Sequence, residues 1–193
     1  MCLGGSERGE TLASEVEKVF ADIEGILGEV PHEQRPRVYL ARAPDGLETG
    51  LRGSINTEII ERAGGRNVAY SPGQYGLVQA LPEQILIADP DTIITREHLF
   101  YHQVWRDPFW SGITAVKNGR VYLSPIAPFS WIDAPPSINR IMGLKWLAGL
   151  FYPLRWQRDL RAEVREFYRT WYHIDLNDED LDRLLQWTGG RAR

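Results

Sequence analysis

The sequence predicts an α/β fold: a three-layer lobe whose central, mainly parallel sheet is flanked by helices and preceded by a long helix. Short apolar strands alternate with helical segments between residues 37 and 124, several helices follow, and an amphipathic stretch precedes the first strand. Because a strand–helix–strand unit joins its strands by a crossover, this alternation indicates a parallel sheet that is covered on both faces.

The composition is that of an ordinary soluble globular domain. The chain has 193 residues, of which 43% are hydrophobic and 25% are charged, and its formal net charge is −4. This length allows one domain, or one domain with appendages. The charge balance gives no indication of nucleic-acid binding, so no nucleic-acid partner is expected.

Cysteine usage and apolar patterning exclude further classes. Cys2 is the only cysteine, so the chain can form neither an internal disulfide nor a cysteine-based metal site. The most apolar segment, Ile141–Phe151, is too short to span a bilayer and is interrupted by Lys145. The first residues lack the basic and apolar regions of a signal peptide, so the chain as written is expected to stay in the cytoplasm.

The first half of the chain carries the first predicted elements. A helix is expected from Thr11 to Val30, because apolar side chains recur there at three- and four-residue steps until a proline ends the pattern. The apolar segment Arg37–Ala41 predicts a buried strand. Next come a glycine-rich loop, Ala43–Gly53, and a helix, Ile55–Ala63, which Ser54 would cap and Gly64-Gly65 would end.

The second half continues the alternation and then becomes helical. An Asp-Pro-Asp turn leads into the strand Thr92–Thr95, and an Asn-Gly turn leads into the strand Val121–Ser124. The segment Asn67–Gly76 is expected to be irregular. The predicted helices of this half span Pro82–Ala88, Glu97–Val104, about Ser137–Phe151, about Arg158–Trp171 and about Asp178–Trp187.

A stiff aromatic loop, Ser130–Arg140, lies between the strand that ends at Ser124 and the following helix. In open α/β sheets, ligands bind beyond the carboxyl ends of the strands, which is where this loop must lie. Phe129 and Trp131 flank its proline-rich turn, and exposed rings on a stiff loop would suit a flat or bulky ligand. Trp131 is equally suited to a place in the core beneath the helix.

Two further patterns have both a functional and a structural interpretation. The loop Gly46–Ser54 follows a strand and precedes a helix, as phosphate-binding loops do, but it lacks the dinucleotide glycine spacing and a Gly-Lys-Ser/Thr sequence. His98 and His102 lie one helical turn apart and could share a metal with a third ligand such as Glu97 or Glu48. We prefer to interpret them as surface histidines. The sequence has no nucleophile motif, so catalysis is not expected.

Several segments resemble one family in their order and spacing. They are Arg37–Gly53 with Pro44-Asp45-Gly46-Leu47-Glu48-Thr49, Ser54–Asn56 with Gly64–Val68, Leu81–Leu86 leading to Asp89–Ile94, Asp107–Trp110 with Ala115–Tyr122, Trp131–Arg140, and Tyr172–Leu176 with Asp180–Leu185. Nearly the whole chain thereby resembles the C-terminal lobe of a cluster A, or class III, periplasmic solute-binding protein of an ABC importer.

The resemblance implies two α/β lobes joined by one long, rigid connecting helix, with the ligand in the cleft between them. Residues 1–35 would be an N-terminal remnant and the inter-lobe helix, and residues 36–193 the C-terminal lobe. The N-terminal lobe has no counterpart here, so we expect a truncated lobe that acts with a separately encoded N-terminal lobe or as a homo-oligomer. The family is periplasmic, in contrast to the cytoplasmic location that the N-terminus predicts.

The resemblance also implies a cargo, a partner and site residues. The expected ligand is an iron chelate such as a ferric siderophore, with haem, cobalamin or molybdate as related possibilities, and the expected partner is an ABC permease. The ligand-binding residues carried over to the loops at the strand ends are Glu48, Thr49, Arg96, Phe129 and Trp131. An acidic residue would dock on the permease, and the candidates are Glu58, Glu61 and Asp133.

Two other functions stay open. One is a doubly wound α/β enzyme that binds a phosphorylated substrate at the Gly46–Ser54 loop. The other is a remnant that binds no ligand. The preferred hypothesis is a non-enzymatic, partial substrate-binding component of an ABC importer without a resident cofactor or metal.

Overall fold

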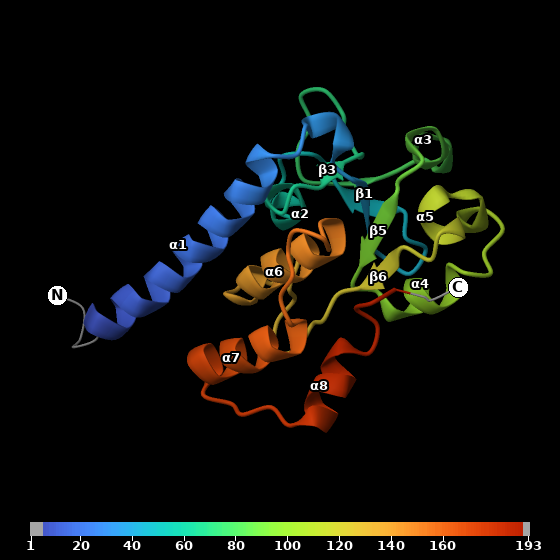
Figure 1. Cartoon of the computed structure of the whole chain (residues 1–193). Coiled ribbons are helices and arrows are strands. Elements are labelled where there is room, and N and C mark those ends of the chain that lie inside the picture. Colours follow the sequence, from blue (N-terminus) through green and yellow to red (C-terminus); the bar gives the residue numbers. More distant parts are fainter. Residues whose placement is uncertain (1–5, 191–193) are drawn as a thin grey trace.

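The computed structural model describes residues 6–190 and places four parallel strands at the centre of the chain (Figure 1). The sheet has the order β3-β1-β5-β6, and each neighbouring pair is parallel. The strands span Arg66–Asn67 (β3), Arg37–Ala41 (β1), Thr92–Thr95 (β5) and Val121–Leu123 (β6). The predicted α/β fold with a central, mostly parallel sheet is therefore confirmed.

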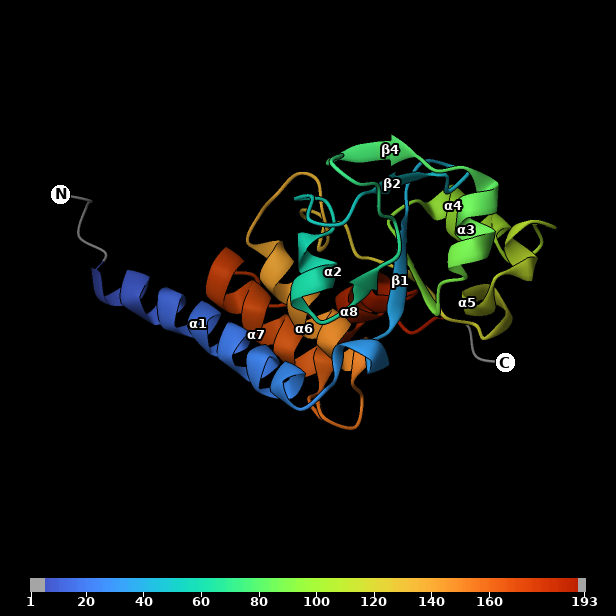
Figure 2. The same cartoon turned by 90° about the horizontal axis from the view of Figure 1, so that it is seen from above.

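Helices cover both faces of this sheet (Figure 2). One face carries α1 (Ser6–Gly28), α2 (Glu58–Arg62), α6 (Asn139–Phe151), α7 (Leu160–Tyr172) and α8 (Asp178–Leu185). The other face carries α3 (Pro82–Ala88), α4 (His98–Gln103) and α5 (Thr114–Lys117). Two 3-10 turns, η1 (His32–Gln34) and η2 (Trp110–Gly112), complete the helical elements among residues 6–190.

Alternation along β1 divides the interior into two cores. Val38 and Leu40 point to the side of α2 and α6, whereas Tyr39 and Ala41 point to the side of α3 and α4. All four residues are buried, as a parallel strand with both faces covered requires. The sheet is thus a rigid base from which the loops at its carboxyl ends project.

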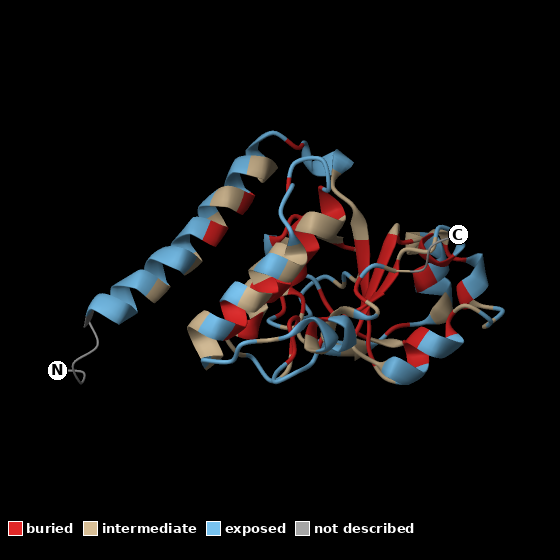
Figure 3. Ribbon diagram, turned by 60° about the horizontal axis from the view of Figure 1, so that its bottom comes forward, coloured by how far each residue is buried: buried red, intermediate tan, exposed pale blue. Residues whose placement is uncertain are grey.

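The helix α1 lies along the outside of the molecule, and its N-terminal half extends away from the rest (Figures 1 and 3). Among residues 7–28 of this helix, only Val19 and Ile23 are buried, both against the core on the α6 side. Within residues 6–190, no helix combines the length and the apolar character that crossing a bilayer would require.

Three local predictions differ from the structure. The loop Ala43–Gly53 contains a short strand, β2 (Glu48–Gly50), which pairs antiparallel with β4 (Leu77–Gln79). The segment from residue 67 to 76, which was expected to be irregular throughout, begins with the last residue of β3 and then leads to β4. The second helix begins at Glu58 rather than at residue 55, because residues 54–57 form a turn in which the Thr57 amide donates to the Ser54 carbonyl at 3.1 Å. Ser54 is consequently not the helix cap.

A glycine allows the aromatic loop to lie directly on α6. A Cβ atom added to Gly143 would come within 1.9 Å of the Trp131 carbonyl oxygen, which is far inside any real contact. Trp131 itself is fully buried, and its ring meets that of Trp146 edge-on at 6.2 Å. The position of the loop beyond β6 is therefore fixed by backbone-to-helix contact as well as by its prolines.

Candidate functional site

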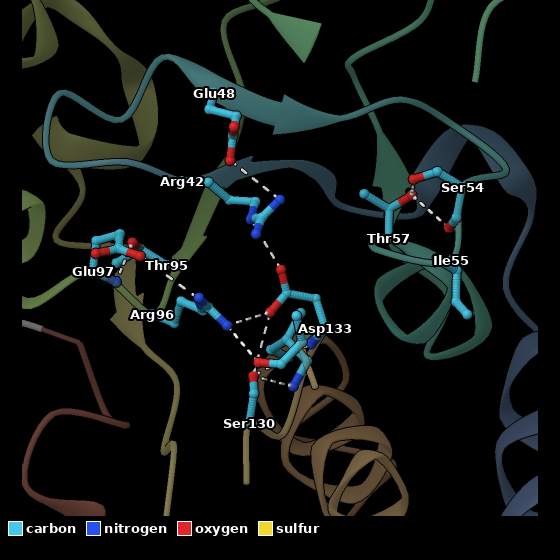
Figure 4. Close-up of polar contacts among 12 residues, drawn as sticks. Arg42, Glu48, Ser54, Ile55, Thr57, Thr95, Arg96, Glu97, Ser130 and Asp133 are labelled. Atoms are coloured by element: carbon cyan, nitrogen blue, oxygen red, sulfur yellow. Dashed lines mark hydrogen bonds and ion pairs between the residues drawn. The ribbon is translucent and has the colours of Figure 1, made fainter. Parts of the chain in front are cut away.

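Two arginines from adjacent strands converge on one carboxylate at the carboxyl end of the sheet (Figure 4). Arg42 directly follows β1 and Arg96 directly follows β5, and the last residues of these strands, Ala41 and Thr95, are register partners. The Arg42 Nε lies 3.0 Å from Asp133 Oδ2, and the Arg96 Nη1 lies 3.4 Å from Asp133 Oδ1. Parallel pairing thus places two guanidinium groups side by side on the rim.

Asp133 is the anchor of this cluster. Its side chain is fully buried, and it belongs to the aromatic loop between β6 and α6. The hydroxyl of Ser130 accepts hydrogen bonds from the amides of Ile132 and Asp133 at 3.2 and 3.3 Å, which closes a tight turn. The same hydroxyl lies 3.4 Å from Asp133 Oδ1. Arg96 also donates to the Ala134 carbonyl, so the loop and the β5 rim are tied together.

The turn between β1 and β2 brings a second carboxylate to Arg42, because Arg42 and Glu48 form an antiparallel bridge across it. The Glu48 Oε1 lies 3.2 Å from the Arg42 Nη1, and the two residues also share a backbone bond in which the Arg42 amide donates to the Glu48 carbonyl at 2.8 Å. On the other side, Glu97 Oε1 lies 3.6 Å from Arg96 Nε. The site therefore holds two guanidinium groups and three carboxylates joined by four ion pairs: Asp133 contacts both arginines, Glu48 contacts Arg42, and Glu97 contacts Arg96.

Arg42 is strongly desolvated for a charged residue. Its side chain is 11% exposed, and within residues 6–190 its Nε and Nη1 atoms have no hydrogen bond of good geometry despite their ion pairs. Buried donors that lack an aligned acceptor are costly, and a guanidinium offers several of them in one plane. Both Arg42 atoms face carboxylates, Nη1 at 3.2 Å from Glu48 and Nε at 3.0 Å from Asp133, so a further anion would have to take the place of one of these.

Of the five predicted ligand residues, three are at least partly exposed at the rim and two are fully buried. Glu48 and Arg96 lie in the cluster, and Phe129, 43% exposed, lies on the loop beyond β6. Thr49 is fully buried in β2. The side chain of Trp131 is fully buried against Trp146 and takes the place in the core that was its alternative interpretation, because Gly143 lets the loop lie directly on α6.

Arg42 is the residue that sequence reasoning misses. A charged residue that directly follows a buried strand is the signal that could have found it, because such a position opens onto the ligand-binding rim. In the sequence, Arg42 is only the first polar residue after an apolar segment, and nothing else marks it as functional.

The three candidate docking residues differ in their burial and in their partners. The side chain of Asp133 is fully buried and pairs with two arginines, which does not favour it as a docking residue. Burial would raise the pKa of Glu58, but its ion pairs with Arg140 and Arg62 outweigh this and hold the pKa below its ordinary value. Glu61 accepts hydrogen bonds from the Gly53 amide and the Thr57 hydroxyl at 3.0 Å. Glu58 and Glu61 stay predictions.

The Gly46–Ser54 loop does not form a phosphate cradle. Its amides are used internally: those of Leu51 and Arg52 donate to the carbonyls of residues 76 and 69, and that of Gly53 donates to the Glu61 carboxylate. A phosphate would need these N–H groups free. The phosphorylated-substrate enzyme is therefore not favoured.

The histidine pair has aromatic neighbours. The ring of His102 lies 5.3 Å from that of Trp187 and 5.6 Å from that of Tyr101. Over residues 6–190, no group of three or more His, Cys, Asp or Glu side chains is placed to hold a metal ion.

Comparison with known proteins identifies the family of this α/β lobe. The model of the family described as periplasmic binding protein matches residues 1–127. The chain belongs to this family of periplasmic solute-binding proteins of ABC transporters. Its relatives are solute-binding proteins rather than enzymes, and iron as the cargo is not specifically supported by them.

Relatives and solved structures define the extent of the likeness. The molybdate-binding protein MolA of Haemophilus influenzae is 31% identical over 86% of this chain and 46% of MolA. The substrate-binding lipoprotein YvrC of Bacillus subtilis is 26% identical over 78% of this chain and 46% of YvrC. A solute-binding protein of Sulfurospirillum deleyianum superposes with a TM-score of 0.87 at 34% identity, over 93% of this chain and 56% of that one. The chain spans about half the length of the relatives it matches.

Proposed function

We propose that this chain supplies one wall of the solute site in the binding component of an ABC importer, and that its solute is an anion held by Arg42 and Arg96. The observation that carries the proposal is the convergence of the Arg42 and Arg96 guanidinium groups at the carboxyl end of the sheet, where one of the carboxylates on Arg42, that of Glu48, belongs to a side chain that is 38% exposed. Because guanidinium groups bind the oxygens of oxyanions through paired hydrogen bonds, two of them on one rim favour a compact oxyanion.

The related MolA supports an oxyanion in preference to an iron chelate. MolA of Haemophilus influenzae is described as molybdate-binding, and a structure of it bound to molybdate superposes on this chain with a TM-score of 0.72 at 28% identity. We therefore propose molybdate or a similar tetrahedral dianion as the solute. An anionic iron chelate is the second candidate, because the exposed ring of Phe129 would suit a bulkier ligand.

A closed site needs a second wall. A rim on one lobe buries much less of a ligand than a pocket does, so binding by this chain alone should be weak. The chain matches about half of each relative, and we propose that another lobe, from a longer form of the chain, a separate chain or a second copy, completes the site. Delivery to an ABC permease outside the cytoplasm is part of the same proposal.

Calorimetric titration tests the anion site. Sodium molybdate is added to the wild-type chain, to Arg42→Gln and to Arg96→Gln, with a ferric hydroxamate as the second ligand. Each variant removes one fork of donors, so we expect the molybdate affinity to fall at least about tenfold. Arg183→Gln is the matched control, because Arg183 pairs with Glu179 on the exposed face of α8.

Two results would contradict the proposal. One is molybdate binding that survives both rim substitutions unchanged. The other is tight binding of the ferric hydroxamate with no detectable molybdate heat, which would favour the iron-chelate candidate.

A further inference from the structure

We infer that Glu48 is a built-in competitor for the solute: its carboxylate occupies Arg42 in the empty lobe and must leave when an anion binds. This inference rests on the proposed function, because it concerns which anions Arg42 and Arg96 accept. It makes Glu48 a specificity-determining residue rather than a direct ligand contact.

Exposure distinguishes the two carboxylates on Arg42. The Asp133 side chain is fully buried and is held by Ser130 and Arg96 as well as by Arg42. The Glu48 side chain is 38% exposed, and across residues 6–190 Arg42 is the one side chain within ion-pair distance of its carboxylate. Leaving Arg42 would cost Glu48 one partly solvated ion pair, which is a weak interaction. Asp133 could not leave without stranding a buried charge.

The backbone around Glu48 need not move for this exchange. The Glu48 carbonyl accepts from the Arg42 amide at 2.8 Å, and the Leu47 carbonyl accepts from the Ala80 amide at 2.8 Å. In the β2–β4 ladder, Glu48 is the register partner of Gln79. The backbone around Glu48 is therefore pinned at both sides, and only a side-chain rotation is required to move its carboxylate into solvent.

Charge explains why the exchange should select among anions. Arg42 and Arg96 carry two positive charges, against three negative charges on Glu48, Glu97 and Asp133, so the cluster is negative by one charge when empty. An incoming anion is repelled unless Glu48 withdraws. A dianion with several oxygens can replace the ion pair that is lost, whereas chloride offers one charge and no planar pair of acceptors. The resident carboxylate therefore rejects weakly charged anions.

The test compares two neutralising substitutions in the whole chain. Wild type, Glu48→Gln and Glu29→Gln are titrated by calorimetry with sodium molybdate and, separately, with sodium chloride at constant low ionic strength. Glu29 is the matched control, because its carboxylate also pairs with a single arginine, Arg155, but lies before β1 at the opposite rim of the sheet. Circular dichroism melting checks that all three proteins are folded.

The expected result is that Glu48→Gln binds molybdate about two- to fivefold more tightly than wild type, the size expected for one partly exposed ion pair. The preference for molybdate over chloride should fall at the same time, and Glu29→Gln should match wild type. If wild type binds molybdate and Glu48→Gln binds it equally or more weakly, the inference is overturned while the anion site stands. If neither protein binds molybdate, the inference and the anion part of the proposed function are both overturned.

Discussion

The Arg42 guanidinium lies 3.0 Å from the carboxylate of Asp133, whose side chain is fully buried, and this contact joins the end of β1 to the loop beyond β6. Arg96 reaches the same carboxylate from the end of β5. Removing one partner of a buried, paired group leaves an uncompensated charge, which costs far more than the pair itself contributes. Asp133 is thus both a structural tie and the element that positions the two arginines.

Replacing Asp133 by Asn should destabilise the fold by about 3 kcal/mol or more, because two guanidinium groups would face each other without their buried counter-ion. The free energy of unfolding, measured by urea titration, tests this. The control is Glu29→Gln, which breaks an exposed pair with Arg155 and should change stability little. If Asp133→Asn lowered the free energy of unfolding only slightly, solvent would already screen the charges of the two arginines.

Replacing Gly143 by Ala should cost about 1–3 kcal/mol or more, since the new Cβ would overlap the Trp131 carbonyl at 1.9 Å and backbone must move. Gly149 lies on the same helix, and its added Cβ would meet only a Trp156 ring atom at 3.5 Å, an ordinary contact. Gly149→Ala should therefore be neutral or stabilise by about 0.5–1 kcal/mol through helix propensity. Thermal unfolding of the two variants should shift in opposite directions. Equal shifts would contradict the close packing of the loop.

Replacing Ser130 by Ala should cost about 1–2 kcal/mol, because its hydroxyl accepts from two amides in the turn that presents Asp133. Ser111→Ala is the control, since the Ser111 hydroxyl makes an exposed bond to the Pro108 carbonyl at 2.9 Å. The Ser130 variant should also weaken molybdate binding, because the Asp133 carboxylate loses its support. An unchanged urea midpoint for Ser130→Ala would show that the prolines alone hold this turn.

The opposite rim of the sheet predicts a pH dependence. Burial would raise the pKa of Asp91, but hydrogen bonds and charge from Arg37 outweigh burial and hold that pKa below its ordinary value of 3.8. A depressed pKa in the folded state contributes stability above the unfolded value, and this stability is lost as the pH falls through the folded pKa. The unfolding free energy should therefore fall below about pH 4.

Asp91→Asn tests the origin of this acid sensitivity. The variant should be less stable than wild type at pH 7 and should show a shallower decline between about pH 4 and pH 2. Some decline should remain, because the pKa values of Asp89 and Glu58 are also lowered. A slope identical to that of wild type would exclude the Arg37 pair as a cause.

The strands β1, β5 and β6 could be predicted because each is a short apolar run between turn residues, and the alternation with helices fixed their parallel pairing. The antiparallel pair β2–β4 could not be predicted in the same way. Its strands have three residues each and no alternation, and its register pairs residues 48 and 79, which lie far apart in the sequence. Contacts of that range leave no local pattern.

The site was predictable in position but only partly in composition. The rim follows from the parallel sheet, so Arg96 could be placed on it from sequence alone. The burial of Trp131 depends on a single small residue 12 positions later, Gly143, and a loop aromatic gives no local sign of such a contact. Glu48 was expected as a ligand contact, but its ion pair with Arg42 arises from an antiparallel bridge between these two residues, in a segment that the sequence indicated only as a glycine-rich loop.

The register between Ala41 and Thr95 has a consequence for selectivity. Because Arg42 and Arg96 each stand one residue past this pair, their backbones are held one interstrand spacing, roughly 4.8 Å, apart. Each guanidinium lies at the end of a long side chain, so the two charges come together through the Asp133 carboxylate that both of them contact. A change at position 133, rather than a change of strand register, is then the simplest way to alter the size of the anion that the two arginines can share.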